Sequence, residues 1–394
     1  MTFLLSSQNV FEYLARQEIY SQKELDLSQV EPKVAKNFNL LLSLPDGRKL
    51  LVKQERHNQE GKTAGEFLNE WRIQEFLQRF LELSHIRSRL SEVLHFDAEH
   101  SVIVFNYLND YCDLAEFYTK ENVFPTAIAA EIGATLATVH QATLDRQQYQ
   151  KFFSQNPAGV PIDQASKIAR GLERIGPEIF GRVPADGLKF FALYQRYDSL
   201  GKAISELTVA FDPCCLTHND LKLNNILVHN DWEQALCQAE LSTVSIIRLI
   251  DWERCTWGDP AFDLGTLIAS YLQIWLGSLV VSQSIDIQEA LRLAMTPLDM
   301  IQPSIAALAR AYLSNFPEIL ERRPHFLRRV VQFSGLALIH QIQAMLQYQK
   351  SFGNTGICML QVAKSLLCRP EQSIPTVFGV AESELLASVV PLLK

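Results

Sequence analysis

Residues 217–227 read Thr217-His218-Asn219-Asp220-Leu221-Lys222-Leu223-Asn224-Asn225-Ile226-Leu227, residues 249–253 read Leu249-Ile250-Asp251-Trp252-Glu253, and residues 258–265 read Gly258-Asp259-Pro260-Ala261-Phe262-Asp263-Leu264-Gly265. A hydroxyl that attacks a γ-phosphate needs a carboxylate to accept its proton and oxygen ligands to hold Mg²⁺ against the phosphates. Asp220 is suited to the first task, and Asn225 and Asp251 are suited to the second. Turn and capping chemistry is the structural alternative for these three residues.

The residues before these motifs predict a strand-rich region with one helix. Runs at 38–43 and 49–54, joined by Pro45-Asp46-Gly47, predict a β-hairpin. Apolar residues at helical spacing predict a helix over 66–83, and the β-branched run 101–105 predicts a strand.

From about residue 110 onward the pattern becomes helical, starting with a predicted helix over 126–144. Short strands are expected at 225–229 and 244–250, separated by a polar insert at 230–242. The chain from 262 to 394 predicts helices with breaks near Pro297, Pro303, Pro317, Pro324, Gly353 to Gly356 and Pro370. A chain of 394 residues exceeds what one hydrophobic core usually holds, so two parts are expected.

Composition excludes several classes of partner and location. The 36 Lys and Arg against 44 Asp and Glu give a net charge of −8, so a nucleic-acid partner is not expected. Seven Cys without a Cys-x-x-Cys motif, and a start that lacks a signal sequence, favour a reducing cytoplasmic location. The uncharged segment 264–285 is long enough to span a membrane, but its polar residues and lack of flanking basic clusters favour a buried helix.

Together the motifs resemble the aminoglycoside phosphotransferase and choline kinase superfamily, relatives of the protein kinases. The resemblance lies in His218-x-Asp220 followed after four residues by Asn225, and in Ile250-Asp251-Trp252-Glu253 with Gly258-Asp259-Pro260 and Asp263 downstream. It implies an α+β, bilobal protein-kinase-like fold with a small β-rich N-lobe and a larger, mostly helical C-lobe. Residues 1–108 would bind the nucleotide, and residues 109–394 would carry the catalytic and acceptor-binding groups.

The same resemblance implies ATP and Mg²⁺ as cofactors and assigns further roles. Lys53 matches the residue aimed at the α and β phosphates, and Glu70 matches its ion-pair partner. Tyr107 and Leu108 fall where the backbone contacts adenine, and Lys222 would lie near the transferred phosphate. Asn225 and Asp251 would be the metal ligands, Asp220 the catalytic base and His218 a structural residue of its loop. Asp259 and Asp263 would brace the metal loop, residues 250–253, and the helix that follows it.

Some assignments have structural alternatives. Glu66 and Glu75 share a helix with Glu70 and compete for its role. His140 on an apolar helix face is expected to be a hydrogen-bonded core histidine, and the cluster Arg322, Arg323, Arg328 and Arg329 is expected to be a solvated surface, with an acidic-ligand patch as the alternative. Between residues 31 and 46 there is no Gly, so a Gly-rich phosphate loop is missing, and Lys33, Lys36, Asn37 and Asn39 occupy its place.

The function expected from these residues is ATP-dependent phosphoryl transfer to a hydroxyl group. The acceptor is a small alcohol or, as the alternative favoured by Lys222, a Ser or Thr of a precursor peptide in lanthipeptide-type biosynthesis. Aminoglycosides are polycations, and the helical part is not acidic enough to favour them. A nucleotide-binding pseudokinase is the competing class, motivated by the missing Gly loop.

Overall fold

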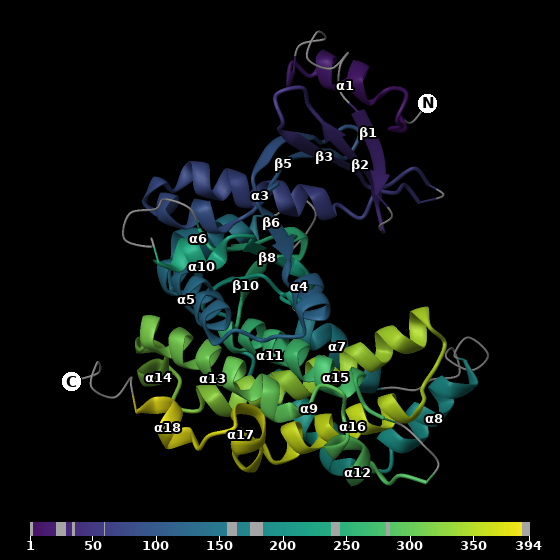
Figure 1. The fold of residues 1–394 in the computed structure, drawn as a ribbon, viewed down its shortest axis with the longest axis vertical. Helices are drawn as coiled ribbons and strands as arrows, with labels where there is room; N and C mark the ends of the chain where they lie inside the picture. The colour runs from purple at the N-terminus through teal and green to yellow at the C-terminus, as the bar shows by residue number, and fades with distance from the viewer. Residues whose placement is uncertain are drawn as a thin grey trace. The chain divides into compact units, whose positions relative to one another are not determined.

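The computed structural model describes residues 3–20, 29–33, 36–58, 60–155, 164–173, 184–237, 245–280 and 284–387. Contacts between residues divide the chain into two compact units. The first unit comprises Met1–Glu116 and Asn225–Cys255, and the second comprises Phe117–Asn224 and Thr256–Lys394. The first unit is strand-rich and the second is larger and mostly helical, so the predicted α+β class is confirmed (Figure 1). The predicted roles of 1–108 and 109–394 remain predictions.

A five-stranded antiparallel sheet forms the centre of the first unit, in the order β1-β2-β3-β5-β4. Gly47, in the turn between the second and third strands, has φ of 85°, a backbone conformation that favours glycine. The expected hairpin is therefore confirmed. The strands are β1 Gln29–Lys33, β2 Phe38–Ser43, β3 Lys49–Gln54, β4 Val93–Asp97 and β5 Val102–Tyr107.

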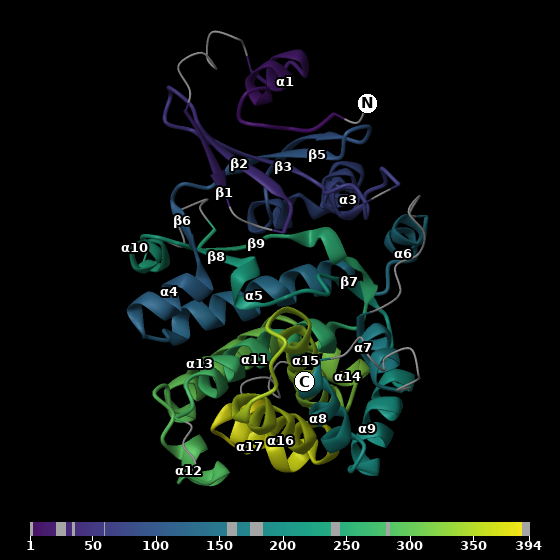
Figure 2. The same cartoon turned by 90° about the vertical axis from the view of Figure 1, so that its right-hand side faces the viewer.

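The two faces of this sheet pack against different helices, because side chains alternate along a strand. Figures 1 and 2 show α1 (Val10–Arg16) and α3 (Glu66–Arg79) on opposite sides of the sheet. Leu51, Ile103 and Phe105 belong to the face that packs against Phe67 of α3. Lys53 has the same parity as Leu51 on β3 and therefore shares this face. The face toward α1 carries Leu40, Leu42, Leu50, Val52, Val102 and Val104.

A second, three-stranded sheet explains why residues after 224 belong to the first unit. Its strands β6 (Tyr111–Asp113), β8 (Ile226–His229) and β9 (Ile247–Leu249) lie in the order β6-β8-β9. The strands predicted at 225–229 and 244–250 are confirmed, the second with tighter bounds. A short helix, α10 (Trp232–Cys237), occupies part of the polar insert, and residues 238–244 lie outside the described residues. The 3-10 helix η1 (Leu81–Arg89) follows α3, so the predicted helix ends earlier than residue 83.

The second unit is built from helices that pack along one another. Helix α5 packs against α13, α11 against α15, and α15 against α16. Two short strands, β7 (Cys215–Thr217) and β10 (Thr256–Gly258), pair antiparallel. The helices are α4 Leu114–Glu121, α5 Thr126–Thr143, α6 Gln147–Ser154, α7 Gln164–Glu173, α8 Ala185–Tyr194, α9 Asp198–Val209, α11 Pro260–Gly277, α12 Ile287–Arg292, α13 Leu298–Asn315, α14 Glu318–Arg322, α15 Phe326–Tyr348, α16 Asn354–Cys368, α17 Pro370–Phe378 and α18 Glu382–Leu386.

The helix predicted over 126–144 is confirmed by α5, but one predicted break is wrong. Pro303 lies inside α13, where it removes one main-chain hydrogen bond, while packing along α5 supports the helix around it. Breaks occur near the other predicted positions. Most of the segment predicted as a buried apolar helix lies in α11, whose side chains are largely buried. None of the helices in the described part of the chain is long and apolar enough to cross a membrane.

Candidate functional site

Lys53 and Asp251 meet in the first unit, although 198 positions separate them in the sequence. The Lys53 Nζ atom lies 3.5 Å from Asp251 Oδ1 and 5.0 Å from the centre of the Phe105 ring. The two side chains are 19% and 35% exposed, so this ion pair is partly shielded from water. Phe105 was not singled out from the sequence. Its place opposite Leu51 on the neighbouring strand puts it beside Lys53.

Asp251 has an unusual backbone conformation, with φ of 68° and ψ of 54°. Such left-handed angles are uncommon outside glycine and often mark functional positions. The next residue, Trp252, is fully buried, and its Nε1 donates a 3.0 Å hydrogen bond to the Leu249 carbonyl. The Ile250 N–H donates to the Asn225 carbonyl at 3.0 Å. The two proposed metal ligands therefore come from backbone segments that are hydrogen-bonded to each other.

Glu70 is the one glutamate of α3 that is buried, since Glu66 is half-buried and Glu75 is exposed. Its Oε1 accepts a 2.8 Å hydrogen bond from the Ser91 hydroxyl, and Oε2 has no hydrogen-bond partner within the described structure. Burial, and secondarily the charge of Asp251, raises the pKa of Glu70 to about 8. Lys53 pairs with Asp251 in this structure, and the Lys53–Glu70 ion pair remains a prediction.

A third carboxyl group, Glu253, belongs to the same region. Burial, followed by the charges of Asp251 and Glu66, raises its pKa to about 7. The sequence motif contains Glu253, but no role was predicted for it.

In the described part of the chain, no group of three or more His, Cys, Asp or Glu residues is arranged to hold a metal ion. A metal held by Asp251 and Asn225 would complete its coordination with phosphate oxygens and water, as Mg²⁺ usually does.

Two lysines from the region where a Gly-rich loop is missing form ion pairs of their own. Lys33 contacts Glu31 at 2.8 Å, and Lys36 contacts Glu66 at the start of α3, with 2.6 Å between Lys36 Nζ and Glu66 Oε2.

The segment predicted to contact adenine begins at the end of β5, where Tyr107 is 37% exposed. The Leu108 carbonyl accepts from the Tyr111 N–H at 3.2 Å. Contact of Tyr107 and Leu108 with adenine stays a prediction, as does any phosphate contact of the two lysines.

In the second unit, Asp263 holds the loop that carries Asp220. Its Oδ2 accepts from the His218 N–H at 2.6 Å, and its Oδ1 accepts from the Asn219 N–H at 2.8 Å. His140 contacts the same carboxylate through Nε2 at 3.3 Å and the Tyr312 hydroxyl through Nδ1 at 2.9 Å. The side chains of Asp263, His140, His218, Asn219 and Tyr312 are all buried. The prediction that His140 is a hydrogen-bonded core histidine is confirmed.

Asp220 is displayed on this loop beside Lys222. The Asp220 N–H donates to His218 Nδ1 at 3.3 Å, which fixes the start of the loop. Lys222 Nζ lies 3.1 Å from Asp220 Oδ2, and the two side chains are 47% and 18% exposed. The loop thus presents a carboxylate and an ammonium group that solvent can reach. Their predicted catalytic roles are not tested by this geometry.

The prediction of a solvated arginine surface is wrong for two of the four arginines. Arg329 donates to Asp259 Oδ2 at 2.5 Å, and Arg323 contacts Asp212. Their side chains are 14% and 11% exposed, whereas Arg322 and Arg328 are about half exposed. Arg329 lies against Asp259, which is fully buried and caps α11 by accepting from the Ala261 N–H, because a buried carboxylate is costly unless a cation pairs with it. Arg323 pairs instead with the side chain and main-chain carbonyl of Asp212. The hydrogen bonds described for Asp259 and Asp263 support α11 and the Asp220 loop rather than the metal loop.

The structure therefore gathers the predicted residues into two groups. Lys53, Glu70, Tyr107, Leu108, Asn225 and Asp251 belong to the first unit, and Asp220 and Lys222 belong to the second. Sequence reasoning missed Ser91, Phe105 and Glu253. Only Glu253 had a usable signal, because it lies two residues after Asp251 in a quoted motif.

A family model and several solved structures are similar to this chain, and the family model alone covers more than half of it. The model of the phosphotransferase enzyme family matches residues 35–298. A choline/ethanolamine kinase family protein from Mesorhizobium loti is 16% identical, with 96% of this chain and 99% of that chain covered and a TM-score of 0.48. A choline kinase from Streptococcus pneumoniae is 15% identical, with 92% and 98% covered and a TM-score of 0.42. An ADP-bound aminoglycoside phosphotransferase is 14% identical, with 92% and 99% covered and a TM-score of 0.47. Among curated protein sequences, none matches this chain.

Proposed function

Because the chain belongs to the phosphotransferase enzyme family, we propose that it transfers the γ-phosphoryl group of ATP to a hydroxyl group, with Mg²⁺ as the metal ion. The observation that carries this proposal is the 3.5 Å contact between Lys53 and Asp251. It joins a cation suited to phosphate oxygens with a carboxylate suited to a hard metal ion. A surface ion pair of purely structural origin contributes little to stability and explains neither the shielding of this pair nor the left-handed backbone at Asp251.

In the proposed reaction, Lys53 binds oxygens of the α and β phosphates, and Asp251 and Asn225 would hold Mg²⁺. A metal ion held by these two residues would offset the negative charge of the phosphates. Asp220 accepts the proton of the acceptor hydroxyl as that oxygen bonds to the γ-phosphorus. The bond from the γ-phosphorus to the bridging oxygen breaks, and ADP leaves with the electron pair. Lys222 offsets charge on the transferred group.

The proposal assigns supporting roles to the remaining first-unit residues. Tyr107 and Leu108 contact the adenine, and Glu70 orients Lys53 once phosphates are bound. The proposed acceptor is a small alcohol. The Ser or Thr hydroxyl of a peptide is the second candidate, because Lys222 two residues after Asp220 gives the loop the Asp-Leu-Lys order of Ser/Thr protein kinases.

The deciding experiment compares Asp220→Asn with Asp299→Asn, an exposed aspartate of α13 in the same unit. Transfer of labelled γ-phosphate is followed to choline, to other small alcohols and to Ser- and Thr-containing peptides, and ATP binding is measured by calorimetry. Loss of a general base lowers a rate by about 10²- to 10⁴-fold and leaves ATP affinity nearly unchanged. Asp299→Asn should retain full activity.

Two results would overturn this function. A wild-type protein that binds ATP but labels no acceptor of either class would be a pseudokinase. An Asp220→Asn variant as active as the wild type would remove Asp220 from the mechanism.

A further inference from the structure

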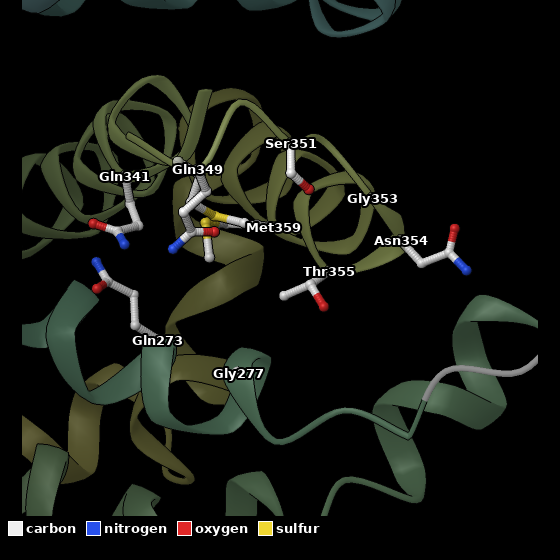
Figure 3. Close-up of a pocket in the computed structure, with 10 residues that line it drawn as sticks. Gln273, Gly277, Gln341, Gln349, Ser351, Gly353, Asn354, Thr355 and Met359 are labelled. Atoms are coloured by element: carbon white, nitrogen blue, oxygen red, sulfur yellow. The ribbon is translucent and has the colours of Figure 1, made fainter. Parts of the chain in front are cut away.

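A cavity of about 610 Å³ lies in the second unit, between the C-terminal end of α11 and the connection from α15 to α16. Figure 3 shows Gln273 of α11 and Gln341 of α15 pointing toward each other, with Gln349 and Met359 nearby. Its polar lining consists of Gln273, Gln341, Gln349, Ser351, Asn354 and Thr355. Side-chain amides therefore make up most of its polar lining.

The lining of this amide pocket has two chemical properties that define its ligand. It contains no charged side chain. Among the described residues, the amides of Gln273, Gln341, Gln349 and Asn354 make no hydrogen bond to another residue. Each amide can donate two hydrogen bonds and accept two more. The fold therefore leaves the amide donors and acceptors of Gln273, Gln341 and Gln349 available beside one another, whereas the Asn354 side chain points away from them (Figure 3).

We propose that the amide pocket binds an uncharged, hydroxyl-rich molecule, a sugar or a polyol. Hydroxyl groups both donate and accept hydrogen bonds, as the amides do. The pocket has no carboxylate to hold a polycation and no Lys or Arg to hold a phosphate or carboxylate. Met345 and Met359 supply adaptable apolar surface for the carbon skeleton.

The amide pocket is separate from the loop that carries Asp220. Asp263, near the start of α11, holds that loop, and Gln273 follows ten residues later on the same helix. At 1.5 Å per residue, the two positions are about 15 Å apart along the helix axis. A bound sugar or polyol is thus either the distant part of an extended acceptor or a separate ligand. Both have the same chemistry at this pocket.

Binding is measured by calorimetry on the full chain without nucleotide, using maltose, N-acetylglucosamine and myo-inositol as probes. At least one neutral probe should bind. Gln273→Met and Gln341→Met keep the side-chain shape and remove hydrogen bonds, so each should weaken binding by roughly three- to tenfold. Gln347→Met is the matched control, because Gln347 is exposed on α15 and lies outside the lining. It should leave the affinity unchanged.

The proposal is overturned if no neutral probe binds, or if the double variant Gln273→Met/Gln341→Met binds it as the wild type does. It is also overturned if glucose 6-phosphate or choline binds in place of the neutral probes and is lost in the double variant. A bound probe that becomes phosphorylated when ATP is added identifies the acceptor, and one that does not identifies a separate ligand. Because binding is read without ATP, failure of this proposal and failure of the proposed phosphoryl transfer are distinguishable.

Discussion

Replacing Glu70 by Gln should stabilise the protein, and the gain should increase with pH. Glu70 is 2% exposed, and its pKa is raised to about 8 from an ordinary value of 4.5, first by burial and then by Asp251. Below pH 4.5 the group is protonated in both the folded and the unfolded chain, so it does not affect stability. Between pH 4.5 and pH 8 only the folded chain retains the proton, so the stability of the wild type falls as pH rises.

The size of the effect follows from proton linkage. A proton retained only by the folded state costs about 1.4 kcal/mol for each pH unit above the unfolded pKa. The penalty from Glu70 is then about 1 kcal/mol at pH 5, about 3 kcal/mol at pH 7 and about 4 kcal/mol at pH 8. Gln has no such penalty, and its carbonyl oxygen can keep the hydrogen bond from Ser91. The gap between variant and wild type should thus widen by about 3 kcal/mol between pH 5 and pH 8.

Urea unfolding at pH 5, 6, 7 and 8 measures this gap. Glu75→Gln is the matched control, because Glu75 lies on the same helix and is exposed. Its free energy of unfolding should track the wild type at each pH. A gap for Glu70→Gln that stays constant from pH 5 to pH 8 would refute the reasoning, because it would mean that Glu70 ionises in the folded protein as it does in water.

Four further substitutions test the rest of the structure. Asp263→Asn should lower the free energy of unfolding, measured in urea, by about 1–3 kcal/mol. The two carboxylate oxygens of Asp263 accept from two main-chain N–H groups, and in the variant the amide nitrogen of Asn, itself a donor, would face one of them. Gly133→Ala should cost about 1–3 kcal/mol, because a Cβ there would lie 2.2 Å from the Leu308 carbonyl oxygen. Gly201→Ala, with nothing nearer than 3.8 Å, should instead raise the thermal midpoint, as Ala is the better helix former. Lys53→Ala should weaken the rise in thermal midpoint that ATP with Mg²⁺ gives the wild type, and an unchanged rise would remove Lys53 from the nucleotide site.

Local patterns in the sequence were sufficient for the elements whose signals are local. The hairpin of β2 and β3 follows from two apolar runs around an Asp-Gly turn, and α5 follows from its helical periodicity. The two motifs at 217–227 and 249–265 could be recognised because their spacing is short and specific. Helix α1 was missed, because seven residues carry too little periodicity, and its helix depends on packing against the sheet.

Partners across long sequence distances could not be predicted. The contact between Lys53 and Asp251 was not predicted, because 198 positions separate the two residues and only the tertiary fold brings β3 and the segment after β9 together. The predicted pairing of Lys53 with Glu70 stays a prediction. The prediction that Arg323 and Arg329 are solvated was wrong, because it used only the type of residue and not the position of acidic partners in the fold. A cluster of arginines is usually solvated, whereas here Arg329 pairs with Asp259 at the start of α11 and Arg323 pairs with Asp212, two partners that are distant in the sequence.

The region around Lys53 connects stability with the proposed chemistry. Glu70, Asp251 and Glu253 bring three carboxyl groups together, and burial together with mutual repulsion raises the pKa of Glu70 and Glu253. This arrangement weakens the fold near neutral pH, so packing alone does not explain it. A bound divalent cation would favour the ionised carboxylates, and ionised Glu70 could then pair with Lys53. Substitutions that make this region more stable, Glu70→Gln first among them, should therefore weaken nucleotide binding, because they remove the charge that the proposed reaction uses.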